Sequence, residues 1–599
     1  MSRMRALARR LDRTGAGPAL RGLARPVVGA VRRRRVDRVA QELLSSGLFD
    51  AGYYAAEAGV DFPSAAVAAR HYVRRRAERR WSPHPLIAFA AIPAAVRDTW
   101  VKGGVAAMLA YFRSARASQR QWSPVFDPTQ LPAGGKGAAL AFIASLRDDT
   151  VLPTSPRLGG TEVTWSQARS RAIRTAQGIR AQVPEVRRLN QLKPTGDAPH
   201  TGWVELGRDL VDWEAVSRSL PERVAGRVSI VIPAYRDFRM TLDAVRFITE
   251  HTADHDIEVI VVDNGSSGPV SQALAQAVGC FPRTEVVRLP INYNFALGSN
   301  VGAARSTGEF ILFLNNDTAV REGWLEPLLE RLEDDAIRGV QPLLLYPDET
   351  IQCAGIEFLA ADFLPAVPLA GHPAEDARAV AGVPFSAVTA AALLMRASEV
   401  VALRGFDPIF VNGSEDIDLC LRATERFGGS FAVVPRSVVE HRESRTPGRG
   451  LRIPENRRIF LERWRGRLPA PGSATLAALG LEVAHLRPAG GVHPVALPVV
   501  VRPRQAGMDA TGREVPRLRW SIKNPAPGGW YGQRWGDTHF IEDLGQALEA
   551  QGQEVVSFRR NAQLSPATAL DDVNLAIRGM FQGSSRKSGA SVVAWAVMG

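Results

Sequence analysis

Residues 228–233 read VSIVIP and residues 257–263 read IEVIVVD, two short apolar runs rich in β-branched side chains. Two further runs follow at 285–289 and 310–314, and the segments between the first three runs have helical spacing. Such an alternation is typical of a mainly parallel sheet with helices on its faces, so the sequence predicts an α/β domain. Because ligands of these sheets bind beyond the carboxyl ends of the strands, the residues that follow each run are candidates for a functional site.

The chain of 599 residues is too long for one hydrophobic core, since domains usually hold about 100–200 residues. Its hydrophobic fraction of 45% and charged fraction of 23% are ordinary globular values, so most of the chain is expected to fold. The last part is too short for a complete doubly wound domain of about 150 residues, so we expect a partial unit there, as a truncation would leave. The predicted order is a basic segment at 1–47, a helical module at 48–148, a lead-in region at 149–226, the α/β domain at 227–468, a linker at 469–516 and a Rossmann-like unit at 517–599.

The formal net charge is +13, and part of this excess is an arginine cluster near the start of the chain. Such a segment is attracted to phosphate by charge alone, so an anionic membrane surface, nucleic acid and phosphorylated lipid acceptors all fit as partners. No zinc finger or RNA-recognition signature accompanies the cluster, which makes nucleic acid the least favoured partner. A solvated surface helix is the alternative to membrane attachment. The cluster consists of Arg3, Arg5, Arg9, Arg10, Arg13, Arg21, Arg25 and Arg32 to Arg35.

The cysteines Cys280, Cys353 and Cys420 lie far apart, which argues against a disulfide framework and against a zinc site built from paired cysteines. No apolar run reaches the ~18–20 residues that cross a bilayer, and no signal peptide is evident. We therefore expect a reducing, cytoplasmic location, either free or peripheral on the inner face of the plasma membrane.

Polar motifs follow the strands in a fixed order, and His441 comes after them. Each motif alone is weak, since a strand that ends in Asp occurs in many α/β folds. The motifs are Val228 to Tyr235 (VSIVIPAY), Val261 to Ser266 (VVDNGS), Asn292 to Gly302 (NYNFALGSNVG), Leu314 to Asp317 (LNND) and Glu415 to Arg422 (EDIDLCLR). As an ordered set they resemble glycosyltransferase family 2, and they are most similar to its O-antigen and rhamnan-type enzymes, including rhamnosyltransferases.

The resemblance implies a GT-A fold, with a Rossmann-like, mainly parallel sheet, over residues 227–468, and it places the nucleotide at the end of the second strand. There Asp263 can accept hydrogen bonds from a pyrimidine N–H or a ribose hydroxyl; the alternative is a carboxylate that only caps its own turn. Further donor-binding residues implied by the resemblance are Pro233, Ala234, Tyr235, Asn294, Asn300, Asn315 and Asn316.

Asp317 follows a strongly apolar strand, so its carboxylate is expected at the sheet edge, where it could hold Mg²⁺ or Mn²⁺ against a diphosphate. By the resemblance, His441 completes the metal shell; a lone histidine is otherwise a core or surface residue. Many relatives carry a second acid in this triplet, whereas Asn315 offers only a neutral carbonyl, so we expect modest metal affinity.

Glu415 and Asp416 precede a segment that reads as a helix, 417–427, so both carboxylates should lie at its positive end and stay ionised. The resemblance makes Asp416 the catalytic base for the acceptor hydroxyl and Glu415 its neighbour that orients the acceptor or the base. A capping pair without catalytic duty is the alternative. Asp418 is expected to be a helix-surface or structural residue.

Phe406 and Asp407 resemble the acceptor-side loop of the family, where Phe406 could stack on a sugar face or pack in the core. Phe49-Asp50-x-x-Tyr53-Tyr54 and His71-Tyr72 resemble a short helical module found beside such enzymes, and packing of small helices is the other interpretation of these aromatics. Residues 517–599 resemble the opening of a GT-B glycosyltransferase domain.

The sequence thus predicts an inverting glycosyltransferase that moves a sugar from a nucleoside-diphosphate sugar to a hydroxyl of a cell-surface polysaccharide or a lipid-linked glycan precursor, with rhamnose among the candidate sugars. The alternative, from another class, is a non-catalytic scaffold that binds nucleotide sugars or glycans with the same fold. Retention of Asp263, Asp317, Asp416 and His441 favours the enzyme.

Overall fold

The computed structural model describes residues 17–75, 82–131, 135–159, 162–181, 201–358, 365–442, 452–468, 473–487, 497–502, 505–562, 570–578 and 591–596. The chain divides into two compact units. The helical unit comprises Met1–Pro184 and Ser267–Phe281, and the sheet unit comprises Glu185–Ser266 and Pro282–Gly599.

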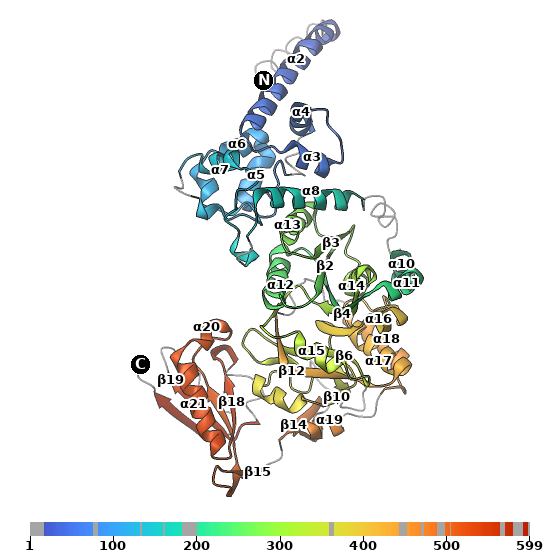
Figure 1. Ribbon diagram of the computed structural model, residues 1–599, viewed down its shortest axis with the longest axis vertical. Coiled ribbons are helices and arrows are strands. Elements are labelled where there is room, and N and C mark those ends of the chain that lie inside the picture. The colour runs from blue at the N-terminus through green and yellow to red at the C-terminus, as the bar shows by residue number, and fades with distance from the viewer. Residues whose placement is uncertain are drawn as a thin grey trace. The chain divides into compact units, whose positions relative to one another are not determined.

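The helical unit contains α2 and a set of shorter helices, and it also takes in one helix from the middle of the chain, α13, which lies alongside α8 (Figure 1). Its helices are α2 (Gly17–Ser45), α3 (Ala51–Ala58), α4 (Ala65–Arg75), α5 (Ala94–Gly103), α6 (Val105–Phe112), α7 (Ala138–Ser145), α8 (Trp165–Ala181) and α13 (Gly268–Val278). Of the arginine cluster, Arg33, Arg34 and Arg35 are exposed on α2. The remaining arginines of the cluster lie outside the described side chains.

The aromatic motif of the helical unit is buried. Asp50 caps α3 by accepting from the backbone N–H of Tyr53 at 2.8 Å. The hydroxyl of Tyr53 donates to Glu57 at 2.9 Å and accepts from Gln272 and Gln276 of α13 at 2.9 and 2.7 Å. Tyr53, Tyr54 and Tyr72 are fully buried. Helix packing, one of the two interpretations of this motif, is therefore what the structure shows for these tyrosines.

The sheet unit is built on a mixed, mainly parallel sheet in the order β10-β12-β6-β11-β4-β1-β2-β3. The pairs β1–β2, β1–β4, β2–β3 and β12–β6 are parallel, and β11 runs antiparallel between β4 and β6. The strands of this sheet are β1 (Val224–Ala234), β2 (Ile257–Asn264), β3 (Thr284–Leu289), β4 (Gly308–Leu314), β5 (Thr318–Val320), β6 (Ile337–Leu345), β7 (Ile351–Cys353), β10 (Pro384–Phe385), β11 (Ala392–Arg396) and β12 (Ser430–His441). The predicted α/β class and each of the predicted strands are confirmed.

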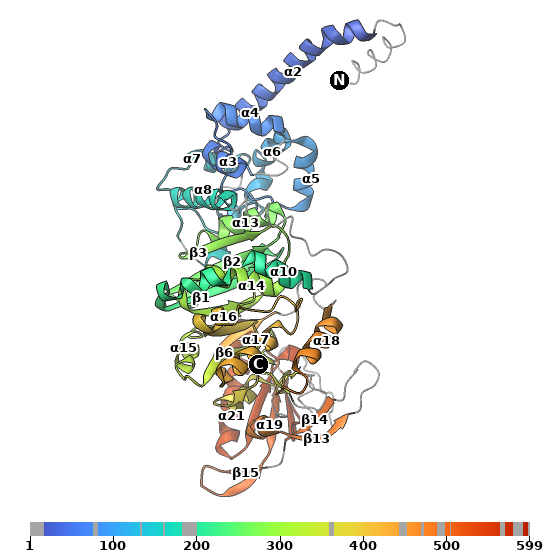
Figure 2. The same cartoon turned by 90° about the vertical axis from the view of Figure 1, so that its right-hand side faces the viewer.

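Helices cover this sheet where the sequence supplies an apolar face or a small residue. Helix α14 packs against β1 and β2 (Figure 2). A side chain at Gly302 would meet Val231 of β1 at 2.3 Å, so glycine is required for this close approach. The helices of the domain are α10 (Thr201–Leu210), α11 (Trp213–Arg218), α12 (Phe238–His251), α14 (Asn294–Arg305), α15 (Glu326–Leu332), α16 (Ala397–Ala402), α17 (Glu415–Phe427) and α18 (Ile453–Trp464).

The C-terminal part forms a parallel sheet of its own in the order β18-β17-β19-β20, with helices α20 (Trp530–Gln533) and α21 (Gly536–Ala550) after its first strand (Figure 1). Its strands are β17 (Arg519–Lys523), β18 (Glu554–Phe558), β19 (Val573–Arg578) and β20 (Ser591–Ala596). The stretch expected to be a linker, 469–516, contains helix α19 (Ser473–Ala478) and two hairpins, β13 (Glu482–Arg487) with β14 (Leu497–Val501) and β15 (Gln505–Met508) with β16 (Glu514–Arg517).

A buried ionic network joins the C-terminal sheet to the larger sheet. Arg519 is 3% exposed, and its guanidinium donates to both carboxylate oxygens of Asp376 at 2.8 Å and to Asp571 at 3.0 Å. Glu554 accepts from Arg519 as well, and Arg502 bridges Glu554 and Asp376 at 3.1 and 3.0 Å. These opposite charges pair in a region of low dielectric, which ties the C-terminal sheet to the segment of the larger domain that carries Asp376.

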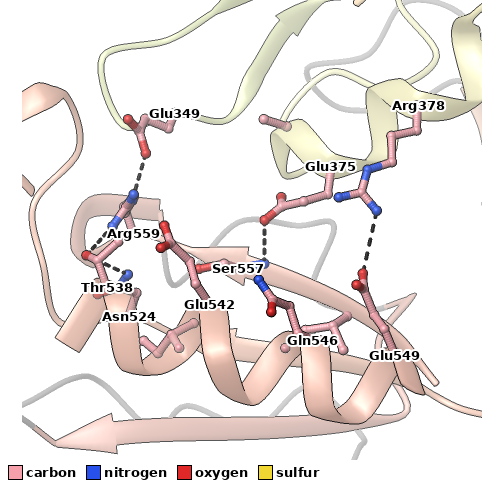
Figure 3. A pocket seen from close by; sticks show the side chains of 14 residues that line it. Glu349, Glu375, Arg378, Asn524, Thr538, Glu542, Gln546, Glu549, Ser557 and Arg559 are labelled. Carbon is pink, nitrogen blue, oxygen red and sulfur yellow. Dashed lines mark hydrogen bonds and ion pairs between the residues drawn. The ribbon is translucent and has the colours of Figure 1, made fainter. Parts of the chain in front are cut away.

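Beside this network lies a pocket of about 330 Å³ between the C-terminal sheet and two segments of the larger domain (Figure 3). On one side Arg559 donates to Glu349 at 2.7 Å, and on the other the backbone N–H of Ser557 donates to Glu375 at 3.2 Å. Burial raises the pKa of Glu375 to about 7. The pocket walls thus add contacts between the two sheets.

Candidate active site

The first two parallel strands end in the same register at the candidate nucleotide position. Ala234 of β1 lies opposite Asp263 of β2, and the carboxylate of Asp263 is fully buried. Its Oδ1 accepts from the backbone N–H of Ser266 at 3.0 Å, as a turn cap does. Its Oδ2 has no hydrogen-bond partner among the described residues. A buried carboxylate oxygen without a donor costs about 1–3 kcal/mol, so this position suits a ligand N–H or O–H.

The turn after Asp263 depends on Asn264 and Gly265, which belong to the motif at 261–266 but were not among the predicted donor-binding residues. Gly265 has φ 81°, and a side chain there would meet the backbone of Ile291 at 2.1 Å. The amide of Asn264 accepts from Tyr293 N–H at 2.8 Å and donates to the carbonyl of Asn294 at 2.7 Å. Together they hold the loop before α14 against the end of β2. A short polar side chain followed by glycine after a strand is the signal that identifies such a turn.

Asn294 begins α14 with a left-handed backbone, φ 68°, and is 4% exposed. Its Oδ1 accepts from the backbone N–H of Leu297 at 3.0 Å, which satisfies one of the free donors in the first turn. Its Nδ2 has no hydrogen-bond partner among the described residues. Like Asp263, Asn294 therefore combines a capping role with one unsatisfied buried polar atom.

Asn300 and Phe406 are structural in this fold. The amide of Asn300 donates to the carbonyl of Phe406 and accepts from its N–H, both at 2.8 Å. The ring of Phe406 is fully buried, with ring centroids of Phe295 and Phe313 at 5.5 and 4.7 Å. Because the amide is occupied by backbone and the ring is enclosed by other rings, neither side chain faces a ligand. The expectation of sugar stacking by Phe406 and of donor binding by Asn300 is corrected accordingly.

Asp407 is held within the protein rather than presented to an acceptor. Its carboxylate accepts from the backbone N–H of Ile409 at 3.0 Å and pairs with Arg463 at 2.8 Å. Arg463 also reaches Asp418, which is fully buried and accepts from Trp464 at 3.0 Å. Asp418 is thus a structural residue, as its position on the helix suggested.

The end of β4 and the end of β12 bring Asp317 and His441 together. Nε2 of His441 lies 3.0 Å from Oδ1 of Asp317, and both residues are buried at 3% and 8% exposure. Nδ2 of Asn315 lies 3.2 Å from the same imidazole nitrogen. Nδ1 of His441 lies 2.6 Å from Oε1 of Gln352, a residue that the sequence had not indicated.

These residues fit a divalent cation that completes its shell with substrate. Two ligands at right angles around a cation at about 2.1 Å are about 3.0 Å apart, which is the spacing of Asp317 Oδ1 and His441 Nε2. Among the described residues, no group of three or more His, Cys, Asp or Glu side chains could hold a metal ion. Cations that bind through one or two protein groups usually take their remaining ligands from phosphate and water.

Asn316 and Tyr235 lie at the same edge but make different contacts. Nδ2 of Asn316 donates to Oγ1 of Thr241 at 2.9 Å, which ties the end of β4 to α12. Tyr235 follows β1 and is half-buried, with the guanidinium of Arg236 at 4.6 Å from its ring centre. Tyr235 and Pro233, which is also half-buried, thus keep some surface that a base could contact.

Glu415 and Asp416 are the first two residues of helix α17, which thus begins two residues before the predicted start at 417. Oδ2 of Asp416 accepts from Oγ1 of Thr389 at 3.0 Å and from the backbone N–H of Ala390 at 3.2 Å. Asp416 remains half-buried, whereas Glu415 is buried and accepts from the backbone N–H of Gly413. Thr389 therefore positions the candidate base, and Glu415 holds the loop that precedes it.

The two halves of the site are connected through one strand end. The backbone N–H of Asn315 donates to the carbonyl of Ala391 at 2.9 Å, and the two preceding residues are those that hold Asp416. Asn315, two residues before Asp317, is thus linked through Ala391 to Ala390, which binds Asp416. Asp263 lies at the carboxyl end of β2, beside β1 in the same parallel set.

Part of the sheet unit is similar in sequence to known glycosyltransferases. Residues 229–350 match the model of glycosyl transferase family 2. The chain is 30% identical over 243 residues to the pre-mycofactocin glycosyltransferase of Mycobacterium tuberculosis, covering 40% of this chain and 47% of that protein. It is 29% identical over 217 residues to the O-antigen biosynthesis protein RfbC of Myxococcus xanthus, covering 34% of this chain and 16% of that protein. The chain thus spans about half the length, or less, of these curated relatives.

Among solved structures, the chain is similar to the mannosyltransferase PcManGT from Pyrobaculum calidifontis in complex with GDP-Man and Mn²⁺. The TM-score is 0.33 and the sequence identity 17%, over 52% of this chain and 79% of that one.

Proposed function

We propose, from the premise that residues 229–350 belong to a glycosyl transferase family 2 domain, that the protein transfers a sugar from a nucleoside-diphosphate sugar to an acceptor hydroxyl with inversion at the anomeric carbon. The observation that carries this proposal is the placement of the Asp317–His441 pair and of Asp416 on neighbouring segments at the carboxyl edge of the sheet. A donor diphosphate and an acceptor hydroxyl can react only if the groups that bind them lie at the same edge of the sheet.

The donor is proposed to lie along the ends of β1, β2 and β4. The unsatisfied Oδ2 of Asp263 and Nδ2 of Asn294 would accept from and donate to the nucleoside, and the half-buried Pro233 and Tyr235 would flank the base. Asp317 and His441, with Asn315 beside them, would hold Mg²⁺ or Mn²⁺. When bound there, the cation supplies positive charge that stabilises the departing diphosphate more in the transition state than in the ground state.

Asp416 would take the proton of the acceptor hydroxyl as its oxygen attacks the anomeric carbon. The bond from that carbon to the diphosphate oxygen breaks in the same step, so one displacement gives inversion. Thr389 and the N–H of Ala390 bind one carboxylate oxygen and orient the other. Asp416 lies in the first turn of α17, the end of a helix that carries partial positive charge.

The acceptor class proposed is a cell-surface polysaccharide or its lipid-linked precursor, in line with the O-antigen protein among the relatives, and rhamnose remains a candidate sugar. Among the described residues, no helix is long and apolar enough to span a membrane. The exposed arginines of α2 are proposed to contact an anionic membrane surface, where each arginine contributes about 1 kcal/mol.

The test is Asp416→Asn with a matched control, Glu425→Gln, which removes an exposed carboxylate from the same helix. Loss of a general base lowers turnover by about 10²–10⁴-fold, so transfer should fall by this factor while donor binding stays within a few-fold of the wild type. The control should keep both. Equal losses of binding and transfer in Asp416→Asn would contradict the base role, and a retained anomeric configuration in the product would contradict the single displacement.

A further inference from the structure

Gln352 lies on the short strand β7 and is 9% exposed. Its Oε1 lies 2.6 Å from Nδ1 of His441, and its Nε2 donates to the backbone carbonyl of the same histidine at 3.5 Å. One amide side chain therefore holds both the ring and the backbone of His441. No other side chain contacts Nδ1 among the hydrogen bonds that the described residues make.

An amide oxygen can only accept, so Nδ1 of His441 must carry the proton in this contact. We propose that Gln352 is a positioning residue that fixes the ring of His441 so that its Nε2 lone pair faces the cation beside Asp317. This inference rests on the proposed function, because it assumes the cation. A histidine that ligates through one nitrogen almost always donates the other N–H to an oxygen, and that second contact sets the direction of the lone pair.

The strand that carries Gln352 is itself held on both sides. Ile351 donates its N–H to the carbonyl of His372, and Gly371 donates to the carbonyl of Ile351, both at 2.7 Å. The other neighbour of β7 is β6, with Cys353 opposite Leu344. The backbone on either side of Gln352 is thus fixed, so the amide reaches His441 without further ordering of the chain.

The loop just before β7 is anchored by the C-terminal sheet. Glu349 accepts from Arg559 at 2.7 Å and from the backbone N–H of Gly529 at 3.1 Å (Figure 3). Glu349 has a left-handed backbone, φ 67°, which is uncommon for a residue with a side chain and needs such support. The contacts that hold the segment around Gln352 therefore come from both the larger sheet and the C-terminal part.

The test measures Mn²⁺ binding to the full chain, alone and with UDP or GDP, by electron paramagnetic resonance. Gln352→Met keeps the length of the side chain but removes the acceptor, so we expect the Kd for Mn²⁺ to rise about 10–100-fold and the nitrogen hyperfine signal of the bound imidazole to weaken. Gln352→Glu restores an acceptor and should keep both within a few-fold of the wild type. A general packing defect would not give this rescue.

Two further variants keep the test decisive. Gln276→Leu removes a buried glutamine that serves Tyr53 in the helical unit and should leave the Kd unchanged. If Gln352→Met does not fold, Gln352→Asn, which keeps an amide but withdraws its oxygen by about one methylene, must show the same loss. Wild-type affinity in the folded Met or Asn variant would overturn the positioning role alone, whereas a wild type that binds no Mn²⁺ under any condition would overturn the metal site of the proposed function.

Discussion

Replacement of Arg519 by methionine removes the only side chain that contacts Asp376, Asp571 and Glu554 together among the described residues. Methionine has a similar length and fills the space, so the change isolates the charge. Asp376 and Asp571 are 3% and 0% exposed in their side chains, and both would lose their bonds to this guanidinium. Asp376 would keep Arg502 at 3.0 Å and His372 at 2.8 Å, and Asp571 would keep Lys523 at 3.9 Å. We expect the contact between the C-terminal sheet and the larger sheet to weaken strongly.

The magnitude follows from the ion pairs. Breaking a buried pair by removing one partner costs about 3–5 kcal/mol. Burial alone would raise the pKa of Asp376, but hydrogen bonding to His372 and the charge of Arg519 lower it from 3.8 to about 2. This pKa difference corresponds to about 2 kcal/mol of stability at neutral pH. It is lower than the cost of breaking the pair because it counts one carboxylate only, although it also includes the effects of His372 and Arg502.

The two pKa shifts determine whether the loss of stability in Arg519→Met grows or shrinks with pH. Because the folded pKa of Asp376 lies below its unfolded value, its stabilising contribution is present above pH 3.8 and is lost as the pH falls toward 2. Burial raises the pKa of Asp571 to about 6, so Asp571 takes up a proton already below neutral pH. The variant can neutralise both carboxylates in acid at little cost. The penalty of Arg519→Met should therefore be larger at pH 7 than at pH 4.

Hydrogen exchange followed by mass spectrometry on peptides that cover β17 measures this penalty as a fall in the free energy of local opening. We expect this free energy to fall by about 3–5 kcal/mol at pH 7 and by less at pH 4. Adding Asp376→Asn removes one of the carboxylate charges that lost its bond to Arg519 and should partly restore it. Unchanged protection of β17 at pH 7, or an equal loss at both pH values, would refute the reasoning.

Two more perturbations test the turn of the donor site and the helical unit. Gly265→Ala places a methyl group 2.1 Å from the backbone of Ile291 and should lower the free energy of unfolding by more than about 3 kcal/mol. The control Gly268→Ala has open space around it and should change the free energy of unfolding by less than about 1 kcal/mol. Equal stabilities of the two variants would show that the turn can relax. Tyr53→Phe leaves the amides of Gln272 and Gln276 without their shared acceptor and should destabilise the helical unit by about 1–3 kcal/mol in thermal unfolding, and a smaller loss would mean that water replaces the hydroxyl.

The sheet could be predicted from the sequence because its strands are short apolar runs that end in polar residues. The runs at 228–233, 257–263, 285–289 and 310–314 all lie within observed strands. The later strands were harder to foresee: β11 enters the sheet antiparallel between β4 and β6, and this pairing is a tertiary choice that periodicity does not encode. The expected linker at 469–516 contains hairpins because valine-rich segments such as 497–501 pair locally despite nearby Gly and Pro.

The site was predictable where a motif follows a strand and unpredictable where distant segments meet. Asp317 and His441 are 124 positions apart in number, yet the antiparallel pairing of β5 with the end of β12, in which His441 lies opposite Thr318, brings them to 3.0 Å. Gln352 and Thr389 carry no local signal, since each acts by orienting a residue from another segment. Asn300 was misassigned because an amide beside glycines suits a ligand as well as it suits the backbone of Phe406.

The central claim is tested most directly by thermal shift of the full chain against a panel of nucleotide sugars, with Mn²⁺ or with EDTA. A donor present at about 100 times its Kd stabilises the folded state by about 2.7 kcal/mol, which raises the unfolding midpoint by several degrees. We expect at least one nucleotide sugar to give this rise with Mn²⁺ in the wild type and the rise to be lost in Asp317→Ala. The claim would be contradicted if the rise were equal with EDTA and with Mn²⁺, if it were equal in Asp317→Ala and in the wild type, or if no donor gave a rise in the wild type.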